Sequence, residues 1–412
     1  MATIAIDASF PDRSVRGLPV WGLLTAAAIA PFDYAIALPV GGGLSLRLLH
    51  VWTLVFGITC VVAYRRTLAR GMGTLPLLFW SLVLTIAVST ALATPSEYLF
   101  RGVADVGLLM LNIGAFTLVY IGLADRPAEW RRFMTVLVIS SVLASISFCA
   151  RALLAARSGL PTVEGAYMLG LGTVTGTYTT AFAAAAAIYL VFATGASRVS
   201  RTVGALIVHG GASLLSLARG PWIGFALGCG VAVPWGLWRL RAHVHAGRAT
   251  LRLLTLPIAL GTIGVILFVT RSEAGTLVAR RLVQVSVLTS GTASWRLQMW
   301  QAMLDESTHS PLFGHGASAY RHISETLGNP GSVSENFPVE MLHAGGLMAL
   351  FFFGAGILLA LQRTLAPEAT AHDVRMRAAC MGGTITLLVG ASTNPAAWLG
   401  LFWVLLAFVA TM

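Results

Sequence analysis

The sequence predicts an all-α, polytopic integral membrane protein with about twelve transmembrane helices and one large loop on the outer side. Apolar residues make up 57% of the chain and charged residues only 10%, whereas a soluble domain is nearer a quarter charged. The apolar runs are long and continuous, as over residues 251–269. Spanning β-barrels instead alternate apolar with polar residues, so the sequence argues against a barrel and against a water-soluble enzyme.

Arginine, glycine and proline bound the apolar runs and mark where each expected span begins and ends. The runs before the large loop are 18–40, 44–64, 74–93, 102–124, 133–154, 168–194, 203–218, 221–238 and 251–270. Those after it are 337–361, 376–392 and 396–412. The chain is thus expected to form one membrane domain, with spans 1–9 in residues 1–270, the loop in 271–336 and spans 10–12 in 337–412.

The charge pattern predicts the orientation. All 27 Lys and Arg residues are arginine. Most of them fall in every second connection, which by the positive-inside rule places those connections and both termini in the cytoplasm. Residues 271–336 then form a loop on the opposite side, and because long loops are usually functional, we expect the soluble chemistry there. The arginines never form a basic domain, which argues against nucleic acid as a partner.

Ionisable side chains at membrane depth are costly and by default mark functional sites. Here they gather at the outer ends of the expected spans, where a guanidinium group can bind a phosphate bidentately. The residues are Asp33, Arg47, Arg101, Asp105, Arg219, Glu335, Glu340 and His343. Arg101 and Asp105 are four residues apart, so a structural ion pair explains these two equally well.

The sharpest local feature is the junction between expected spans seven and eight, which reads SLARGPW over residues 216–222. Pro221 suits the first position of a helix, and Gly220 permits a tight turn before it. Arg219 would then lie beside the free N–H groups of a helix N-terminus, a favourable place for a phosphate. The alternative is an arginine that satisfies loose carbonyls at a helix C-terminus and extends to the interface.

Within the loop, residues 294–304 carry apolar side chains at helical spacing. They predict a helix that lies against the membrane or caps the spans, with Arg296 on its other face. Residues 277–287 show a similar pattern, which we interpret as an interfacial helix. The Gly314-His315-Gly316 turn is a possible phosphate nest, although a lone GxG more often shapes a loop.

Two residue types that often form cross-links or bind metals show no such pattern. The cysteines, Cys60, Cys149, Cys229 and Cys380, lie far apart inside apolar runs, so we expect core residues without disulfides. The loop histidines, His309, His315 and His322, lack regular ligand spacing and have no acidic or cysteine cluster to complete a site. We therefore expect no metal.

The end of the loop supplies a candidate base. Asn336 is a plausible N-cap of the tenth span, and Glu335 directly precedes it. A carboxylate beside a helix N-terminus is favoured in its ionised form, so Glu335 is a candidate general base; the alternative is a solvated loop carboxylate. Glu340 and His343 are three residues apart and are expected to pair with each other or with Arg47.

Together these features resemble the O-antigen ligase and polymerase family, bacterial membrane glycosyltransferases that include lipopolysaccharide ligases and exopolysaccharide polymerases. Residues 216–222 are similar to the family's Ser-x-Ser-Arg-Gly-x-Trp. The spacing agrees over residues 203–361. The other matching elements are Arg296 with Trp300 (Arg-x-x-x-Trp), Pro311 with Gly314 and Gly316, and Glu335-Asn336 running into Gly345-Gly346-Leu347 (a His-Asn element before a Gly-Gly-Leu span).

The resemblance implies a GT-C-like membrane fold and transfer of a glycan from undecaprenyl pyrophosphate to an acceptor hydroxyl on the periplasmic side of the bacterial inner membrane. It implies an inverting reaction without metal or other cofactor. Arg219 and Arg296 would hold the pyrophosphate leaving group, with Arg47 and Arg101 as further candidates. Ligases have histidine at the base position, where this chain has Glu335. The resemblance therefore favours a polymerase of lipid-linked repeat units, with His343 as a second candidate base.

Other functions compete with this interpretation. A ligase that attaches the glycan to lipid A-core is the nearest alternative, and a chain-length regulator is a possible partner. A transporter or lipid-linked oligosaccharide flippase has a similar topology, but its charges should lie near the midplane, whereas here they crowd the outer ends. A non-catalytic assembly partner is a further alternative.

Overall fold

The computed structural model describes residues 17–33, 37–41, 44–157, 208–210, 212, 219–240, 292–328, 334, 336–365, 370–392 and 400–411. The expected spans at 168–194 and 251–270, most of the span at 203–218, the expected helix at 277–287 and Glu335 lie outside this part of the chain.

The described chain is mostly helical. Four of its helices are long and apolar enough to cross a membrane, and a bent pair would make a fifth. The four are α4 (Thr74–Ala93), α5 (Ser96–Leu123), α6 (Pro127–Arg157) and α15 (Phe337–Thr364). The all-α membrane fold is thus confirmed, whereas the count of about twelve spans stays a prediction.

The expected boundaries agree best where proline or glycine punctuates the sequence. Helix α4 has the expected bounds, following Gly73 at its N-cap. Helix α5 begins six residues before the expected start, directly after Pro95, because a helix N-terminus tolerates its charged residues. Helix α6 likewise begins early, with Pro127 at its first position.

The first expected span is wrong beyond Phe32. Helix α1 (Val20–Ile29) continues as the short 3-10 helix η1 (Ala30–Phe32), and the chain then forms an antiparallel hairpin. Its strands are β1 (Ala37–Gly41) and β2 (Leu44–Arg47), with Ala37 opposite Arg47. Pro31, Pro39 and the glycines at the turn disfavour a helix here, and pairing across the hairpin satisfies the backbone groups instead.

A buried carboxylate joins the two short helices that begin beside this hairpin. Asp33 is 1% exposed. Its Oδ1 accepts from the N–H of Leu49 at 2.9 Å, in α2 (Leu48–Ala63), and its Oδ2 from the N–H of Gly400 at 3.1 Å, in α17 (Gly400–Ala410). Negative charge is favourable at helix N-termini, so Asp33 is a structural cap and not a residue of an outer surface.

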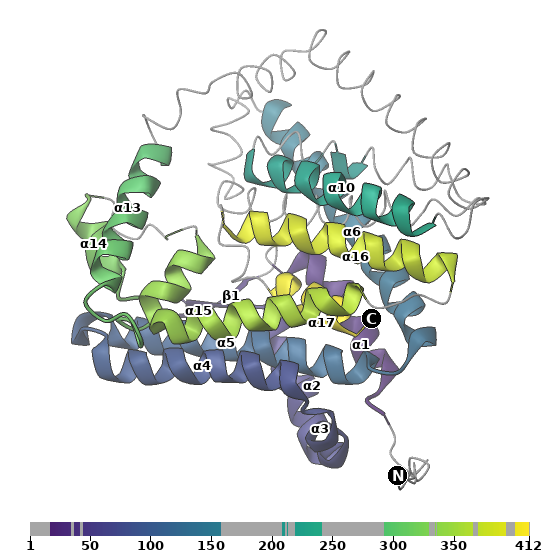
Figure 1. The fold of residues 1–412 in the computed structure, drawn as a ribbon, viewed down its shortest axis with the longest axis horizontal. Helices are drawn as coiled ribbons and strands as arrows, with labels where there is room; N and C mark the ends of the chain where they lie inside the picture. The colour runs from purple at the N-terminus through teal and green to yellow at the C-terminus, as the bar shows by residue number, and fades with distance from the viewer. Residues whose placement is uncertain are drawn as a thin grey trace, which may run out of the picture.

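Helix α5 is central to the bundle and contacts α4, α2 and α17, while α15 packs along α4. The core between them is aromatic, because Phe79 and Phe116 both pack edge-on against Trp403. Helix α2 turns by 102° into α3 (Arg65–Gly71) at Tyr64. Figure 1 shows α4 and α5 side by side beneath α15.

Helices α10 (Arg219–Arg239) and α16 (Ala371–Ala391) form a second close pair, also seen in Figure 1. The absence of side chains allows their backbones to approach: a Cβ on Gly228 would lie 2.4 Å from the carbonyl oxygen of Gly382. The hydroxyl of Thr386 donates to the carbonyl of Gly224 at 3.1 Å. Small residues and interhelical hydrogen bonds of this kind stabilise helix pairs in lipid.

The contacts define two ends of the bundle. Arg377 donates to the carbonyl of Arg363 at 2.9 Å, which places the start of α16 at the end of α15. Helix α10 is antiparallel to α16, with Gly224 near Thr386 and Gly236 near Ala378. The starts of α15 and α10 therefore share one end, here called the site end, and Gly17 with Pro127 marks the far end.

Candidate functional site

The site end is covered by α13 (Thr292–Ser307), which confirms the helix expected at 294–304. Met299 and Met303 are fully buried against Tyr320 and Ile323, next to and within α14 (Arg321–Thr326). The part of the apolar stripe around these two methionines thus faces protein, so the helix caps the spans, while Leu304 is exposed. Figure 1 shows α13 and α14 together beside the first turns of α15.

Trp300 connects α13 to the start of α15. Its indole Nε1 donates to the carbonyl of Ser334 at 2.6 Å, and Ser334 in turn donates to Glu340 at 3.0 Å. Asn336 accepts from the N–H of Val339 at 3.1 Å, which confirms the expected N-cap. The helix that carries Arg296 therefore contacts Ser334, the residue directly before Glu335.

Helix α15 is broken at Gly346, where φ is 64° and ψ is −162°. The loop at 311–316 fills the break. His315 and Gly316 donate to the carbonyls of His343 and Ala344 at 2.8 and 2.9 Å, and Leu347 donates to the carbonyl of Pro311 at 2.8 Å. Backbone groups freed inside a spanning helix are tolerated only when protein or water satisfies them, and this loop does so.

The glycines of the break explain why the loop fits. Gly314 and Gly346 both have positive φ, and a Cβ on Gly346 would lie 2.3 Å from the carbonyl carbon of Leu312. The N–H groups of His315 and Gly316 are occupied by α15. The phosphate-nest interpretation of this turn is therefore wrong, and the expectation that the turn shapes the loop is confirmed.

Near the break, Glu306 contacts three histidines, two through its carboxylate and one through its backbone oxygen. Glu306 on α13 contacts His343 on α15 (Nε2 to Oε2, 2.9 Å) and His322 on α14 (Nε2 to Oε1, 3.2 Å). His315 Nε2 lies 3.0 Å from the backbone oxygen of Glu306, and its ring stacks on His343 with centroids 5.1 Å apart. These four residues are called the Glu306 cluster.

The electrostatics of the cluster follow from its partners. The two ring nitrogens of His322 lie against Glu306 and the carbonyl of Ala319. Burial acts to raise the pKa of Glu306, but the hydrogen bond from His343 and the nearby histidine charges outweigh it, so the pKa lies below its usual value. Glu306 is thus held as a carboxylate.

Two sequence expectations are corrected here. His343 pairs with Glu306, and not with Glu340 or Arg47, because α13 packs against the start of α15 and brings Glu306 to its ring. Glu340 instead accepts from Ser334. Sequence reasoning missed Glu306 because it belongs to no motif and lies far from His343 along the chain.

The expected pair of Arg101 and Asp105 forms, with Nε to Oδ1 at 3.5 Å. Asp105 also accepts from the hydroxyl of Ser318, in the loop after the GxG turn. A Cβ on Gly102 would lie 2.6 Å from the carbonyl oxygen of Ala317, so this loop rests directly on α5. The ion pair therefore anchors the site end of α5 to the loop.

Arg47 lies deeper in the bundle. Its N–H donates to His50 Nδ1 at 3.3 Å, and His50 Nε2 in turn contacts Asn112 at 3.1 Å. Asn112 follows Arg101 by about three turns of α5, or roughly 16 Å along its axis. The structure thus does not bring the backbone of Arg47 together with Arg101.

Arg219 is the first residue of α10, so this helix begins two residues before the position expected from Pro221. Its backbone lies at the site end, and its side chain is outside the described part of the structure. Arg296 is half-buried on α13.

A comparison with known protein families shows which family this part of the chain resembles. The family model of O-antigen ligases matches residues 203–354. Over this region the chain resembles the O-antigen ligase family. The match confirms the resemblance drawn from the short motifs, and with the apolar helices it indicates a multi-pass membrane enzyme of O-antigen or related polysaccharide assembly. No curated protein matches the chain.

The O-antigen ligase match separates the candidate residues into two groups. It covers α10, α13, α14, the Glu306 cluster and the break in α15, all at the site end. Arg47 and Arg101 lie outside it. Within the described residues, no cluster of histidine, cysteine and acidic side chains has the arrangement of a metal site.

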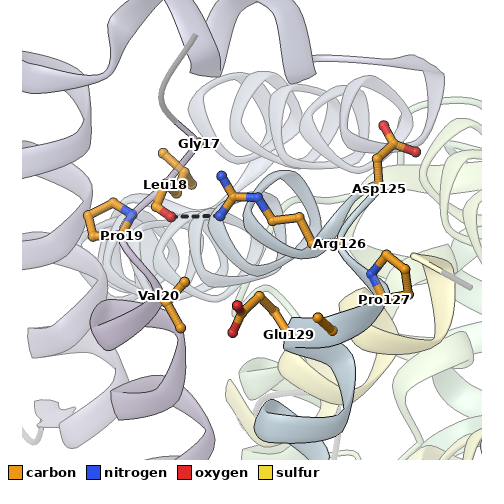
Figure 2. A pocket seen from close by; sticks show the side chains of 9 residues that line it. Gly17, Leu18, Pro19, Val20, Asp125, Arg126, Pro127 and Glu129 are labelled. Carbon is orange, nitrogen blue, oxygen red and sulfur yellow. Dashed lines mark hydrogen bonds between the residues drawn. The ribbon is translucent and has the colours of Figure 1, made fainter. Parts of the chain in front are cut away.

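A cavity at the far end is unrelated to the matched region. It is lined by α1, the segment before it, and the start of α6, and Figure 2 shows Arg126 extending across it. Arg126 donates to the carbonyl of Leu18 at 2.9 Å, so its guanidinium ties the chain before α1 to the bundle. We assign this cavity no part in the chemistry of the site end.

Proposed function

We propose that the chain is a metal-independent, inverting glycosyltransferase that transfers a glycan from undecaprenyl pyrophosphate to an acceptor sugar hydroxyl. The reaction takes place on the periplasmic side of the bacterial inner membrane, which is the site end of the bundle. The observation that carries the proposal is the contact of Trp300 with Ser334. It supports the proposal because it brings the Arg-x-x-x-Trp element next to the residue that precedes Glu335-Asn336, and both elements lie inside the O-antigen ligase match.

Arg219 and Arg296 hold the pyrophosphate leaving group in this proposal. Support comes from their placement: both are at the site end, on helices inside the O-antigen ligase match. Bidentate guanidinium groups stabilise the charge that develops on a departing phosphate. Arg101 lies at the site end but is paired with Asp105. Arg47 lies roughly three turns of α5 away from Arg101. Both therefore have secondary roles in this proposal.

The acceptor is a second lipid-linked repeat unit, so we favour a polymerase. Glu335 stands where ligases of the family have histidine, and a carboxylate can deprotonate a sugar hydroxyl equally well. Glu335 and His343 are the two candidate bases. A ligase that uses lipid A-core as acceptor is the alternative.

A flippase would need charged groups along a path near the membrane midplane. Asp33 and Arg47 lie at the start of α2, but both oxygens of Asp33 accept from helix N-termini, as in a structural cap. The Glu306 cluster and the Arg101–Asp105 pair lie at the site end instead. This distribution favours an enzyme.

The test is a reconstituted assay in which lipid-linked repeat units are the sole substrate and glycan length is read on gels. We expect wild type to lengthen the chains and Arg219→Ala, Arg296→Ala and Glu335→Gln to reduce the rate by about 10²-fold or more. Arg132→Ala is the matched control, because Arg132 is 66% exposed at the far end and should retain full activity.

Two other results would redirect the proposal. Elongation that begins only when lipid A-core is added would identify a ligase. Transfer of substrate across the membrane without any elongation would contradict an enzyme.

A further inference from the structure

His343 is a buried base with one unused nitrogen. Its side chain is 1% exposed, and its Nε2 contacts Glu306 at 2.9 Å. No described residue offers its Nδ1 a hydrogen-bond partner. A buried polar atom without a partner is costly, by about 1–3 kcal/mol, and native proteins keep few of them. We therefore expect this atom to form a hydrogen bond with a ligand.

The partner of Nε2 fixes the tautomer. Glu306 is held as a carboxylate, which only accepts hydrogen bonds, so Nε2 of His343 carries the hydrogen. In the neutral ring Nδ1 then has a free lone pair. A histidine whose far nitrogen donates to a carboxylate has the arrangement of a general base, because the carboxylate orients the ring and stabilises the imidazolium that forms.

The break in α15 holds this ring in place. The carbonyl of His343 accepts from the N–H of His315, and the imidazole of His315 stacks on that of His343. Groups facing the ring come from each neighbouring element: Glu306 from α13, His322 from α14 and His315 from the loop, while Glu340 lies one turn earlier on α15 and accepts from Ser334.

The exposed fraction of the side chains in the Glu306 cluster increases from His343 through Glu306 to His322. The side chain of His343 is 1% exposed, that of Glu306 27% and that of His322 39%. The Glu306 carboxylate contacts one histidine with each oxygen. The Glu306 carboxylate thus links the buried ring of His343 to the partly exposed ring of His322.

The geometry points to His343 Nδ1 as the atom that takes the proton of the acceptor hydroxyl, with Glu306 as its positioning residue and His322 holding the second oxygen of Glu306. This inference rests on the proposed glycosyl transfer. The hydroxyl O–H bond breaks and its proton goes to Nδ1. The oxygen forms a bond to the anomeric carbon, and the carbon–oxygen bond to pyrophosphate breaks, the electron pair leaving with the phosphate. The ring is then an imidazolium paired with the Glu306 carboxylate, and it returns to the Nε2–H tautomer when Nδ1 releases its proton to water as the products leave.

The first test is Glu306→Gln, a nearly isosteric change that removes the charge. We expect kcat to fall by about 10²-fold or more with KM within about twofold, because the acceptor still binds while the imidazolium loses its counter-charge. The acid limb of the kcat profile should also move to lower pH, since a neutral amide stabilises the protonated ring less than a carboxylate does.

The matched control is Glu325→Gln. Glu325 is an exposed carboxylate of α14 at the same end, where it accepts from the hydroxyl of Tyr98 at 2.6 Å. It should leave both kcat and the pH profile unchanged. His343→Gln should abolish elongation while the purified variant keeps the melting temperature of wild type within a few degrees.

The outcomes separate this inference from the proposed function. If wild type elongates chains and Glu335→Gln abolishes the activity, but Glu306→Gln and His343→Gln keep kcat within twofold with an unmoved acid limb, Glu335 is the base and this inference is wrong. The proposed function would then stand. If wild type elongates no acceptor at all, the proposed function fails first.

Discussion

At the scale of single residues, the hydrogen-bonding partners of a charged side chain determine its role. Asp33 and Glu306 are both buried or half-buried carboxylates, yet Asp33 accepts from backbone N–H groups of two helices and Glu306 contacts imidazoles. The first arrangement is a structural cap. The second holds titratable rings in fixed orientations, which is the arrangement that proton transfer requires.

The capping role of Asp33 predicts a loss of stability on removal. In Asp33→Ala the N–H groups of Leu49 and Gly400 lose their shared acceptor while they remain buried, which costs about 1–3 kcal/mol for each group. Thermal unfolding in detergent should show a melting temperature lower by several degrees. Asp305→Ala, at an exposed position on α13, is the control and should leave it unchanged. An unchanged melting temperature in Asp33→Ala would contradict the capping role.

At the scale of elements, the broken helix α15 and the loop at 311–316 form one unit. The loop satisfies the backbone groups that the break exposes, among them the carbonyl of His343, whose ring contacts Glu306 of α13. Neither the break nor the loop is held in its conformation by its own residues alone. The unit depends on positive φ at Gly314 and Gly346.

Gly346→Ala should therefore destabilise the protein. The added Cβ would lie 2.3 Å from the carbonyl carbon of Leu312 and would sit on a backbone with φ of 64°; such strain costs on the order of 1–3 kcal/mol. Gly354→Ala on the same helix meets nothing within 4 Å and should be neutral or slightly stabilising. The melting temperatures of the two variants give the measurement, and an equal effect would refute the role of the break.

At the scale of the whole molecule, the bundle separates a site end from a far end. The site end carries the Glu306 cluster, the starts of α10 and α15, and the loop that rests on α5. The far end carries Arg126 and the chain before α1. This polarity is what a membrane enzyme with chemistry on one face requires.

The expected orientation can be tested by labelling. In a background without the four native cysteines, Glu325→Cys at the site end should react with a membrane-impermeant maleimide in cells with a permeabilised outer membrane. Arg132→Cys at the far end should react only after the inner membrane is opened. The reverse pattern would invert the proposed topology and place the reaction in the cytoplasm.

The sequence by itself determined the fold class, the bounds of α4, the helix at α13, the Asn336 cap and the family resemblance. These features depend on local hydropathy, spacing and capping chemistry, which neighbouring residues along the chain express directly.

Only the tertiary structure decided the hairpin after α1, the break in α15 and the pairing of Glu306 with His343. The physical reason is that each depends on groups brought together by packing. Asp33 caps α2 and α17 from positions far apart in the chain, and the break is stable only because residues 311–316 satisfy it. Hydropathy reports whether a segment is apolar, but it does not report which buried polar group will meet which partner.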